Sequence, residues 1–233
     1  MKLFEKLSNK IKEKKLKKAE IKRANEILLS FAVGNINTLD FYKMYQKDIA
    51  LQDVLENGKI MTKYYKNVDK WGYDNIPAKV IWYNKLHNAN LNCLDDRLEI
   101  FRVIKIYFGN KLRRKKKPVY KNEDVDLFNF LADVFPRYAL LPNLYYDFID
   151  YFLSFIPKGL SKTKTKKIAK EKAKELFKYE KYPPRWMQGC EWPIVGKTPL
   201  TFLYQDGYPL KDIIHYFFRN ESTKEIIIIE QLD

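Results

Sequence analysis

Few side chains in this sequence are of a type, or at a spacing, that would support catalysis. The chain has only two histidines, His87 and His215. A histidine that serves in a nucleophilic triad or a metal site has a nucleophile, a carboxylate or a further ligand beside it. Neither histidine has such a partner nearby in the sequence: His87 lies in an Asn-rich stretch expected to be a loop, and His215 lies among apolar residues on one face of an expected strand. We therefore expect no metal site and no cofactor.

Three further groups resemble reactive motifs only superficially. Asp95 and Asp96 precede an expected helix, where a cap and first-turn acids are favoured. The run 196–198 (GKT) lacks the earlier glycine and the following helix of a phosphate loop. Cys93 and Cys190 are too far apart for zinc-ligand spacing and give no disulfide framework, which fits a reducing compartment. Cys190 is either a reactive thiol or, as free cysteines more often are, a small buried hydrophobe. These features favour a protein that is not an enzyme.

The segment 182–205 is the most distinctive part of the chain. It holds two of the four tryptophans and four prolines, and proline excludes a helix or a central strand. Its large aromatic side chains are therefore either buried in a core or exposed for contact with a partner. In either case polar neighbours form a rigid rim suited to recognition. The candidate partner-binding residues are Arg185, Trp186, Gln188, Glu191 and Trp192.

The formal net charge of +15 is concentrated in three blocks. Residues 1–23 carry ten Lys or Arg against three acids, residues 111–121 carry seven against none, and residues 161–178 carry eight against two. Such blocks attract nucleic acid, acidic proteins or anionic membranes, although lysine-rich helices also simply present solvated faces. The basic-patch candidates are Arg113, Arg114, Lys115, Lys116 and Lys117.

Hydrophobic periodicity changes once along the chain. Helical spacing predominates from about residue 11 to residue 178, with Ser161 predicted to cap a Lys-rich helix. Strand patterns then occupy 200–205, 213–218 and 225–230, and the run of four isoleucines at 226–229 predicts a strand buried on both faces. The predicted fold is α+β, mostly helical with a small carboxyl-terminal antiparallel sheet of about three strands.

We expect three segments: a charged helix at 1–23, a helical region at 24–181, and the Trp/Pro loop with the sheet at 182–233, packed with the helical region. No signal peptide is visible, and no apolar run reaches the roughly 20 residues of a membrane span. The expected location is the cytoplasm.

Three motifs carry a resemblance to a known class of protein. They are PPRWMQGCEWPI (183–194), GKTPLTFLYQ (196–205) and YFF (216–218), and GNIxxxxF (34–41) adds a fainter one. Together they resemble bacterial proteins of the polymorphic-toxin immunity type, mainly over residues 182–218. The resemblance implies no catalytic residue; it implies a cytoplasmic protein that neutralises a cognate toxin by direct binding.

Two function classes therefore stand side by side. The first is an immunity protein that binds a toxin. Because immunity proteins against basic nucleases are commonly acidic, a chain of +15 would need a toxin with an acidic face or a contact through its own less basic side. The second is a nucleic-acid-binding protein that uses the basic segments 1–23, 111–121 and 161–178 as a phosphate track. No helix-turn-helix, zinc or RNA-recognition signature supports the second.

Overall fold

The structure is a computed structural model that describes residues 2–69, 76–112, 117–140, 144–207 and 212–232; in the first helix, side chains are described at residues 14, 15 and from 17 onward. The chain divides into two compact units. Unit 1 contains residues up to 91 and 96–125, and unit 2 contains residues 92–95 and from 126 onward. The division thus lies near residue 125, whereas the segments expected from the sequence meet at residues 23 and 181.

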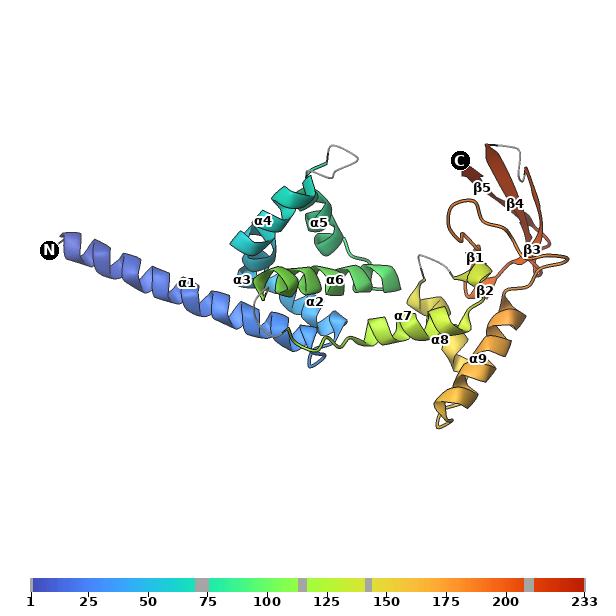
Figure 1. Ribbon diagram of the computed structural model, residues 1–233, viewed down its shortest axis with the longest axis horizontal. Helices are drawn as coiled ribbons and strands as arrows, with labels where there is room; N and C mark the ends of the chain where they lie inside the picture. The colour runs from blue at the N-terminus through green and yellow to red at the C-terminus, as the bar shows by residue number, and fades with distance from the viewer. Residues whose placement is uncertain (1, 70–75, 113–116, 141–143, 208–211, 233) are drawn as a thin grey trace. The chain divides into compact units, whose positions relative to one another are not determined.

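Unit 1 is helical (Figure 1). Its elements are α1 (Lys2–Ala32), α2 (Thr38–Lys47), α3 (Ile49–Gln52), the π-helical turn η1 (Asp53–Asn57), α4 (Lys59–Val68), α5 (Ala78–His87) and most of α6 (Leu94–Lys111). From residue 2 onward, the charged segment and the residues that follow it form one continuous helix, α1. That helix ends where Gly34 adopts a φ of +82°, a conformation that glycine reaches at little cost. Asn37 then caps α2 by accepting a hydrogen bond from the Asp40 amide at 2.8 Å.

An aromatic cluster forms the centre of unit 1. Phe31 stacks on Phe41 with ring centroids 4.2 Å apart, and Phe101 meets Phe31 edge-on at 5.8 Å. All three rings are buried. Beside them the buried Asp124 carboxylate accepts a hydrogen bond from the Thr38 hydroxyl and lies 3.6 Å from the Arg97 guanidinium. The charge of Asp124 is therefore compensated where it is buried.

Unit 2 joins helices to the sheet. Its elements are α7 (Glu123–Val134, from residue 126), the 3₁₀ turn η3 (Arg137–Ala139), α8 (Tyr146–Ser154), α9 (Lys162–Leu176), β1 (Ile194–Val195), β2 (Thr198–Pro199), β3 (Thr201–Asp206), β4 (Ile213–Arg219) and β5 (Ile226–Leu232). The predicted cap of α9 is confirmed, since the Ser161 hydroxyl accepts from the Lys164 amide. Strands β3, β4 and β5 form the three-stranded antiparallel sheet that the sequence predicted, and their order in the sheet is β3-β4-β5. The α+β fold class is thus confirmed.

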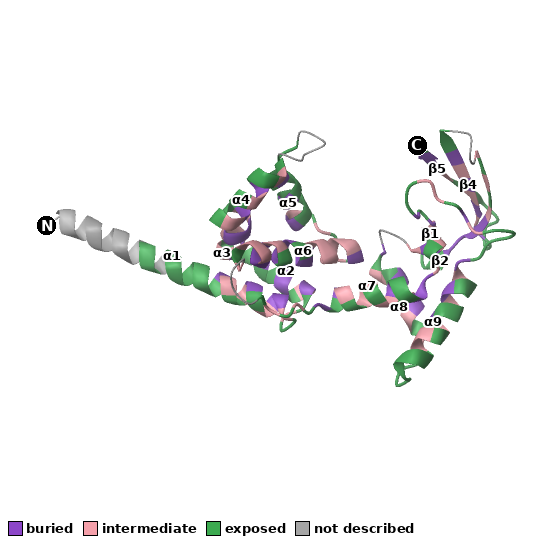
Figure 2. Cartoon of the chain, viewed as in Figure 1, coloured by how far each residue is buried: buried purple, intermediate pink, exposed green. Residues whose placement is uncertain are grey.

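Strand β5 corrects one prediction. It was expected to be buried on both faces, yet Ile226 is 46% exposed and Ile228 is 53% exposed. Figure 2 shows exposed and buried residues mixed along the sheet, because only one face packs against the rest of unit 2. Four consecutive isoleucines therefore lie on an edge strand that is half open to solvent.

Within the described ranges, no helix is long and apolar enough to cross a membrane.

Candidate functional site

The Trp/Pro loop is held on the inner face of the sheet by the hydroxyl of Tyr216. This hydroxyl accepts a hydrogen bond from the Met187 amide at 2.9 Å and donates one to the Arg185 carbonyl at 2.9 Å. Tyr216 is fully buried, and its burial raises the pKa of the phenol. The hydroxyl therefore stays protonated and keeps the loop backbone in place.

Gln231 of β5 holds the same loop from the next strand. Its side-chain oxygen accepts from the amides of Met187 (2.9 Å) and Gln188 (3.2 Å), and its nitrogen donates to the Gly189 carbonyl at 2.7 Å. Gln231 is 1% exposed, and a buried amide is tolerated only when its hydrogen bonds are made. We call the contacts of Tyr216 and Gln231 to residues 185–189 the loop latch.

Trp192 is a core residue. It is buried, its indole nitrogen donates to the Leu200 carbonyl at 2.8 Å, and its ring lies 5.4 Å from Phe177 and 5.3 Å from Phe218. It therefore joins the end of α9 to the sheet, and it is not available to a partner as long as unit 2 is folded.

Trp186 is half-buried and serves a similar structural role. Its indole nitrogen donates to the Tyr138 carbonyl at 2.8 Å, and its ring stacks on Phe218 at 6.0 Å. The other candidates from the loop, Arg185, Gln188 and Glu191, are exposed. Of the five loop residues proposed from the sequence, these three polar ones form the accessible rim.

Cys190 is not a reactive thiol in this fold. It is buried, and its sulfur lies 3.2 Å from the Tyr138 carbonyl oxygen. Burial raises its pKa to about 11. Because the thiolate is the nucleophile, the thiol is unreactive at neutral pH.

The outer face of the sheet carries a partly exposed apolar row that was not predicted from the sequence. The strand registers place Tyr204, Phe217 and Ile228 side by side across β3, β4 and β5. Tyr204 stacks on Phe217 at 4.4 Å and is 55% exposed, and Ile228 is 53% exposed. Ile226 and Leu232 extend the apolar surface along β5. We call the outward residues of these three strands the outer face.

A charged row lies next to the apolar row. Asp206, His215 and Glu230 are register partners across the three strands, and His215 Nε2 lies 3.1 Å from a Glu230 oxygen. His215 was expected on one face of a strand, and the structure confirms that placement. Two carboxylates against one histidine give this row an acidic balance at neutral pH.

The acidic balance extends through the whole carboxyl-terminal segment. Residues 182–233 contain five Lys or Arg and seven Asp or Glu, whereas the rest of the chain contains 39 Lys or Arg and 22 Asp or Glu. The outer face therefore belongs to a segment of this basic chain that carries net negative charge.

The basic-patch candidates are placed only in part. Arg113, Arg114, Lys115 and Lys116 lie outside the described residues, and Lys117 is exposed. In α9, which supplies most of the block 161–178, Lys166 pairs with Asp133, and the Lys172 ammonium lies 3.0 Å from Glu175.

His87 corrects a second expectation. It is the last residue of α5, not a loop residue, and it has partners that are distant in sequence. Its Nε2 lies 2.9 Å from a Glu56 oxygen and 3.0 Å from the Tyr45 hydroxyl, which itself donates to Glu56 at 2.6 Å. Burial, followed by the nearby Glu56, raises the pKa of Tyr45 far above its ordinary value. The tyrosine is therefore a fixed hydrogen-bond donor in a structural cluster.

Among the described residues, no three His, Cys, Asp or Glu side chains are grouped as metal ligands.

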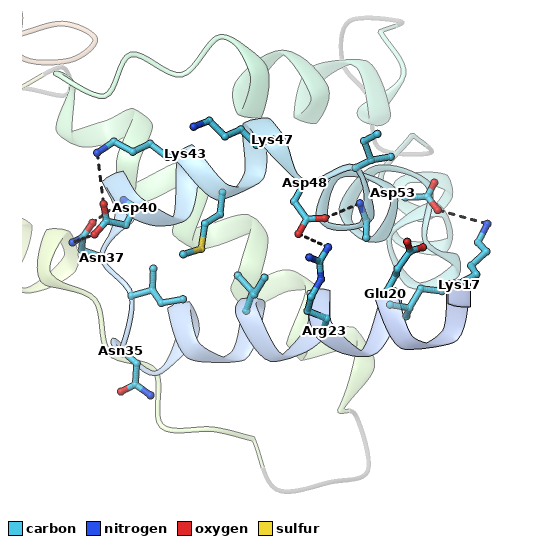
Figure 3. A pocket seen from close by; sticks show the side chains of 16 residues that line it. Lys17, Glu20, Arg23, Asn35, Asn37, Asp40, Lys43, Lys47, Asp48 and Asp53 are labelled. Carbon is cyan, nitrogen blue, oxygen red and sulfur yellow. Dashed lines mark hydrogen bonds and ion pairs between the residues drawn. The ribbon is translucent and has the colours of Figure 1, made fainter. Parts of the chain in front are cut away.

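Unit 1 has an open groove between α1 and the α2–α3 segment, with a volume of about 1180 Å³ (Figure 3). Its charged side chains largely pair with each other: Arg23 lies 2.8 Å from Asp48, and Lys43 lies 3.6 Å from Asp40. Ligand sites usually direct a few polar groups toward one point, whereas most of the charged side chains that line this groove pair with each other. The outer face is consequently the stronger candidate for recognition.

Comparisons with protein-family models, with curated proteins and with solved structures found no match to this chain.

Proposed function

We propose that this protein is a non-enzymatic binding protein of the bacterial cytoplasm, of the immunity type, which neutralises a cognate toxin by direct contact through the outer face. The observation that carries the proposal is the apolar row in which the half-buried Phe217 lies between the exposed Tyr204 and Ile228, beside the acidic row of Asp206 and Glu230. Contiguous exposed apolar side chains rimmed by polar groups are typical of protein interaction sites.

The charge distribution indicates what kind of toxin fits. Nucleases are commonly basic because they bind phosphates, and the carboxyl-terminal segment, where acids outnumber bases, is a part of this chain that a basic partner can approach with little repulsion. The apparent conflict between a net charge of +15 and an immunity role is removed if the contact lies on the sheet.

The loop latch supports the same proposal. It fixes residues 185–189 against the sheet through buried hydrogen bonds, so that the exposed Arg185 and Gln188 lie on a rigid backbone. Rigid surfaces lose less entropy on binding than flexible ones.

Co-expression with the protein encoded directly upstream tests the proposal. We expect that protein to arrest bacterial growth, this chain to restore growth, and the two to co-elute from a sizing column. A Tyr204→Lys variant should lose both effects, while Val195→Lys, at a similarly exposed apolar residue of β1, should keep them. Restored growth without any complex, or no toxicity from the upstream protein, contradicts the proposal.

Nucleic-acid binding is the alternative, and one observation favours it: exposed lysines such as Lys162, Lys167 and Lys170 gather on α9 around a shallow depression. Sequence-selective binding of duplex DNA or RNA at about 150 mM salt would favour this function, because electrostatic, non-specific contacts weaken steeply with salt.

A further inference from the structure

The outer edge of β5 is open, and the register shows which backbone groups face it. Among the described residues, β5 pairs with β4 alone. The Asn220 amide donates to the Glu225 carbonyl at 2.9 Å, which marks 220 and 225 as a hydrogen-bonded pair. Hydrogen-bonded and non-hydrogen-bonded pairs alternate along an antiparallel ladder. Residues 227, 229 and 231 therefore bond to β4, and residues 226, 228, 230 and 232 direct their amides and carbonyls away from it.

This edge lacks the features that usually prevent strand pairing. Natural edge strands are protected by lysine, proline, a bulge or a covering segment. β5 instead presents Ile226 and Ile228, its register with β4 is unbroken, and Glu230 is its only charged residue. Four adjacent isoleucines also favour the extended conformation.

One end of the edge is already occupied. The side-chain amide of Gln188, part of the rim beside the loop latch, donates to the Leu232 carbonyl. Apart from the Leu232 amide, the outward groups that remain belong to Ile226, Ile228 and Glu230, and these three residues are spaced symmetrically about Ile228. An edge with this symmetry is complementary to itself under a two-fold axis.

We propose that two copies of this chain pair through antiparallel β5 strands centred on Ile228. In that register Ile228 faces Ile228 of the second copy, and Ile226 faces Glu230, so that every outward amide and carbonyl of the three residues gains a partner. Like charges that face each other would destabilise the pairing, and in this register no like charges face each other across the junction. The two-fold axis is perpendicular to the sheet, so both outer faces lie on the same side of one continuous sheet.

Strand pairing of this length buries little area compared with permanent dimers. The dimer is therefore expected to form reversibly, with a dissociation constant in the micromolar range. Analytical ultracentrifugation of the full chain should show the mass rising from one chain toward two as concentration increases.

Cysteine cross-linking tests the register. In the proposed pairing the Ile228→Cys side chains meet across a hydrogen-bonded pair, at a Cα separation of about 5.5 Å that a disulfide can span. Ile226→Cys is the matched control: it is similarly exposed, but its counterpart in the second copy lies roughly 13 Å away along the strand. We expect a cross-linked dimer under mild oxidation only with Ile228→Cys. Equal cross-linking of both variants, or of neither, overturns the proposal.

A proline substitution tests the edge without a cross-link. Because the Ile228 amide points away from β4, Ile228→Pro removes no bond of the existing ladder, yet it blocks the incoming strand. We expect at least tenfold weaker dimerisation, with Ile228→Val unchanged. A proline variant that is folded and still dimeric contradicts the proposal. A strictly monomeric parent chain also contradicts it, but leaves toxin binding through Tyr204 to be judged separately.

Discussion

Replacing Trp192 by alanine should severely destabilise unit 2. The side chain is 3% exposed and packs against Phe177, Phe202 and Phe218, and its indole nitrogen makes a buried hydrogen bond to the Leu200 carbonyl. Truncating such a residue costs about 3–5 kcal/mol through lost burial and the cavity that remains. The lost hydrogen bond adds about 1 kcal/mol.

For a unit of this size each kcal/mol lowers the melting temperature by about 4 °C or more. Differential scanning calorimetry of Trp192→Ala should therefore show a transition lowered by more than about 10 °C. Trp192→Phe should lose less, because most of the packing remains, and Arg185→Ala should change stability by no more than about 0.5 kcal/mol, as exposed substitutions do. If Trp192→Ala melts within about 2 °C of the parent, the ring is not a core residue and our assignment of the loop is wrong.

Three further results are expected. Gln231→Leu should destabilise unit 2 by about 1–3 kcal/mol, because the backbone groups of residues 187–189 lose their hydrogen-bond partner. Trypsin should then cleave the variant faster after Arg185. An unchanged cleavage rate would count against the loop latch. The folded chain should resist thiol reagents at Cys190 at pH 8. Its stability should fall between pH 9 and 11, because the pKa of the thiol is near 9.0 in the unfolded chain and about 11 in the folded one. Cys190→Ala should show a shallower fall, and an identical fall would show that ionisation of Cys190 is not the cause. Binding of duplex DNA, followed by fluorescence anisotropy, should be detectable at about 50 mM salt and lost near 200 mM; binding that persists would favour the nucleic-acid alternative.

The sequence predicted those elements that local signals define. The strands at 201–206, 213–219 and 226–232 lie within one or two residues of their predicted ranges, because the hydrophobic period changes there. The helix cap at Ser161 was predicted because its residue type commonly accepts a hydrogen bond from a free amide at a helix start.

Long-range geometry explains what the sequence did not predict. The partners of His87 come from residues 45 and 56, so no local spacing shows them. The latch role of Gln231 depends on a loop more than 40 residues away. The outer face depends on the register between strands, which the sequence does not show. The four isoleucines of β5 predicted a strand buried on both faces, because composition alone does not distinguish a central strand from an edge strand.

Titration calorimetry of the full chain with the protein encoded directly upstream, the proposed toxin, is the most direct test of the proposed function. The outer face predicts a one-to-one contact that Tyr204→Lys weakens at least tenfold, since it places a cation in the apolar row facing a basic partner. Val195→Lys should bind like the parent chain. If Tyr204→Lys binds as tightly as the parent while Lys-to-Glu changes in α9 abolish binding, the contact lies on the basic helices and the outer face is not the binding site.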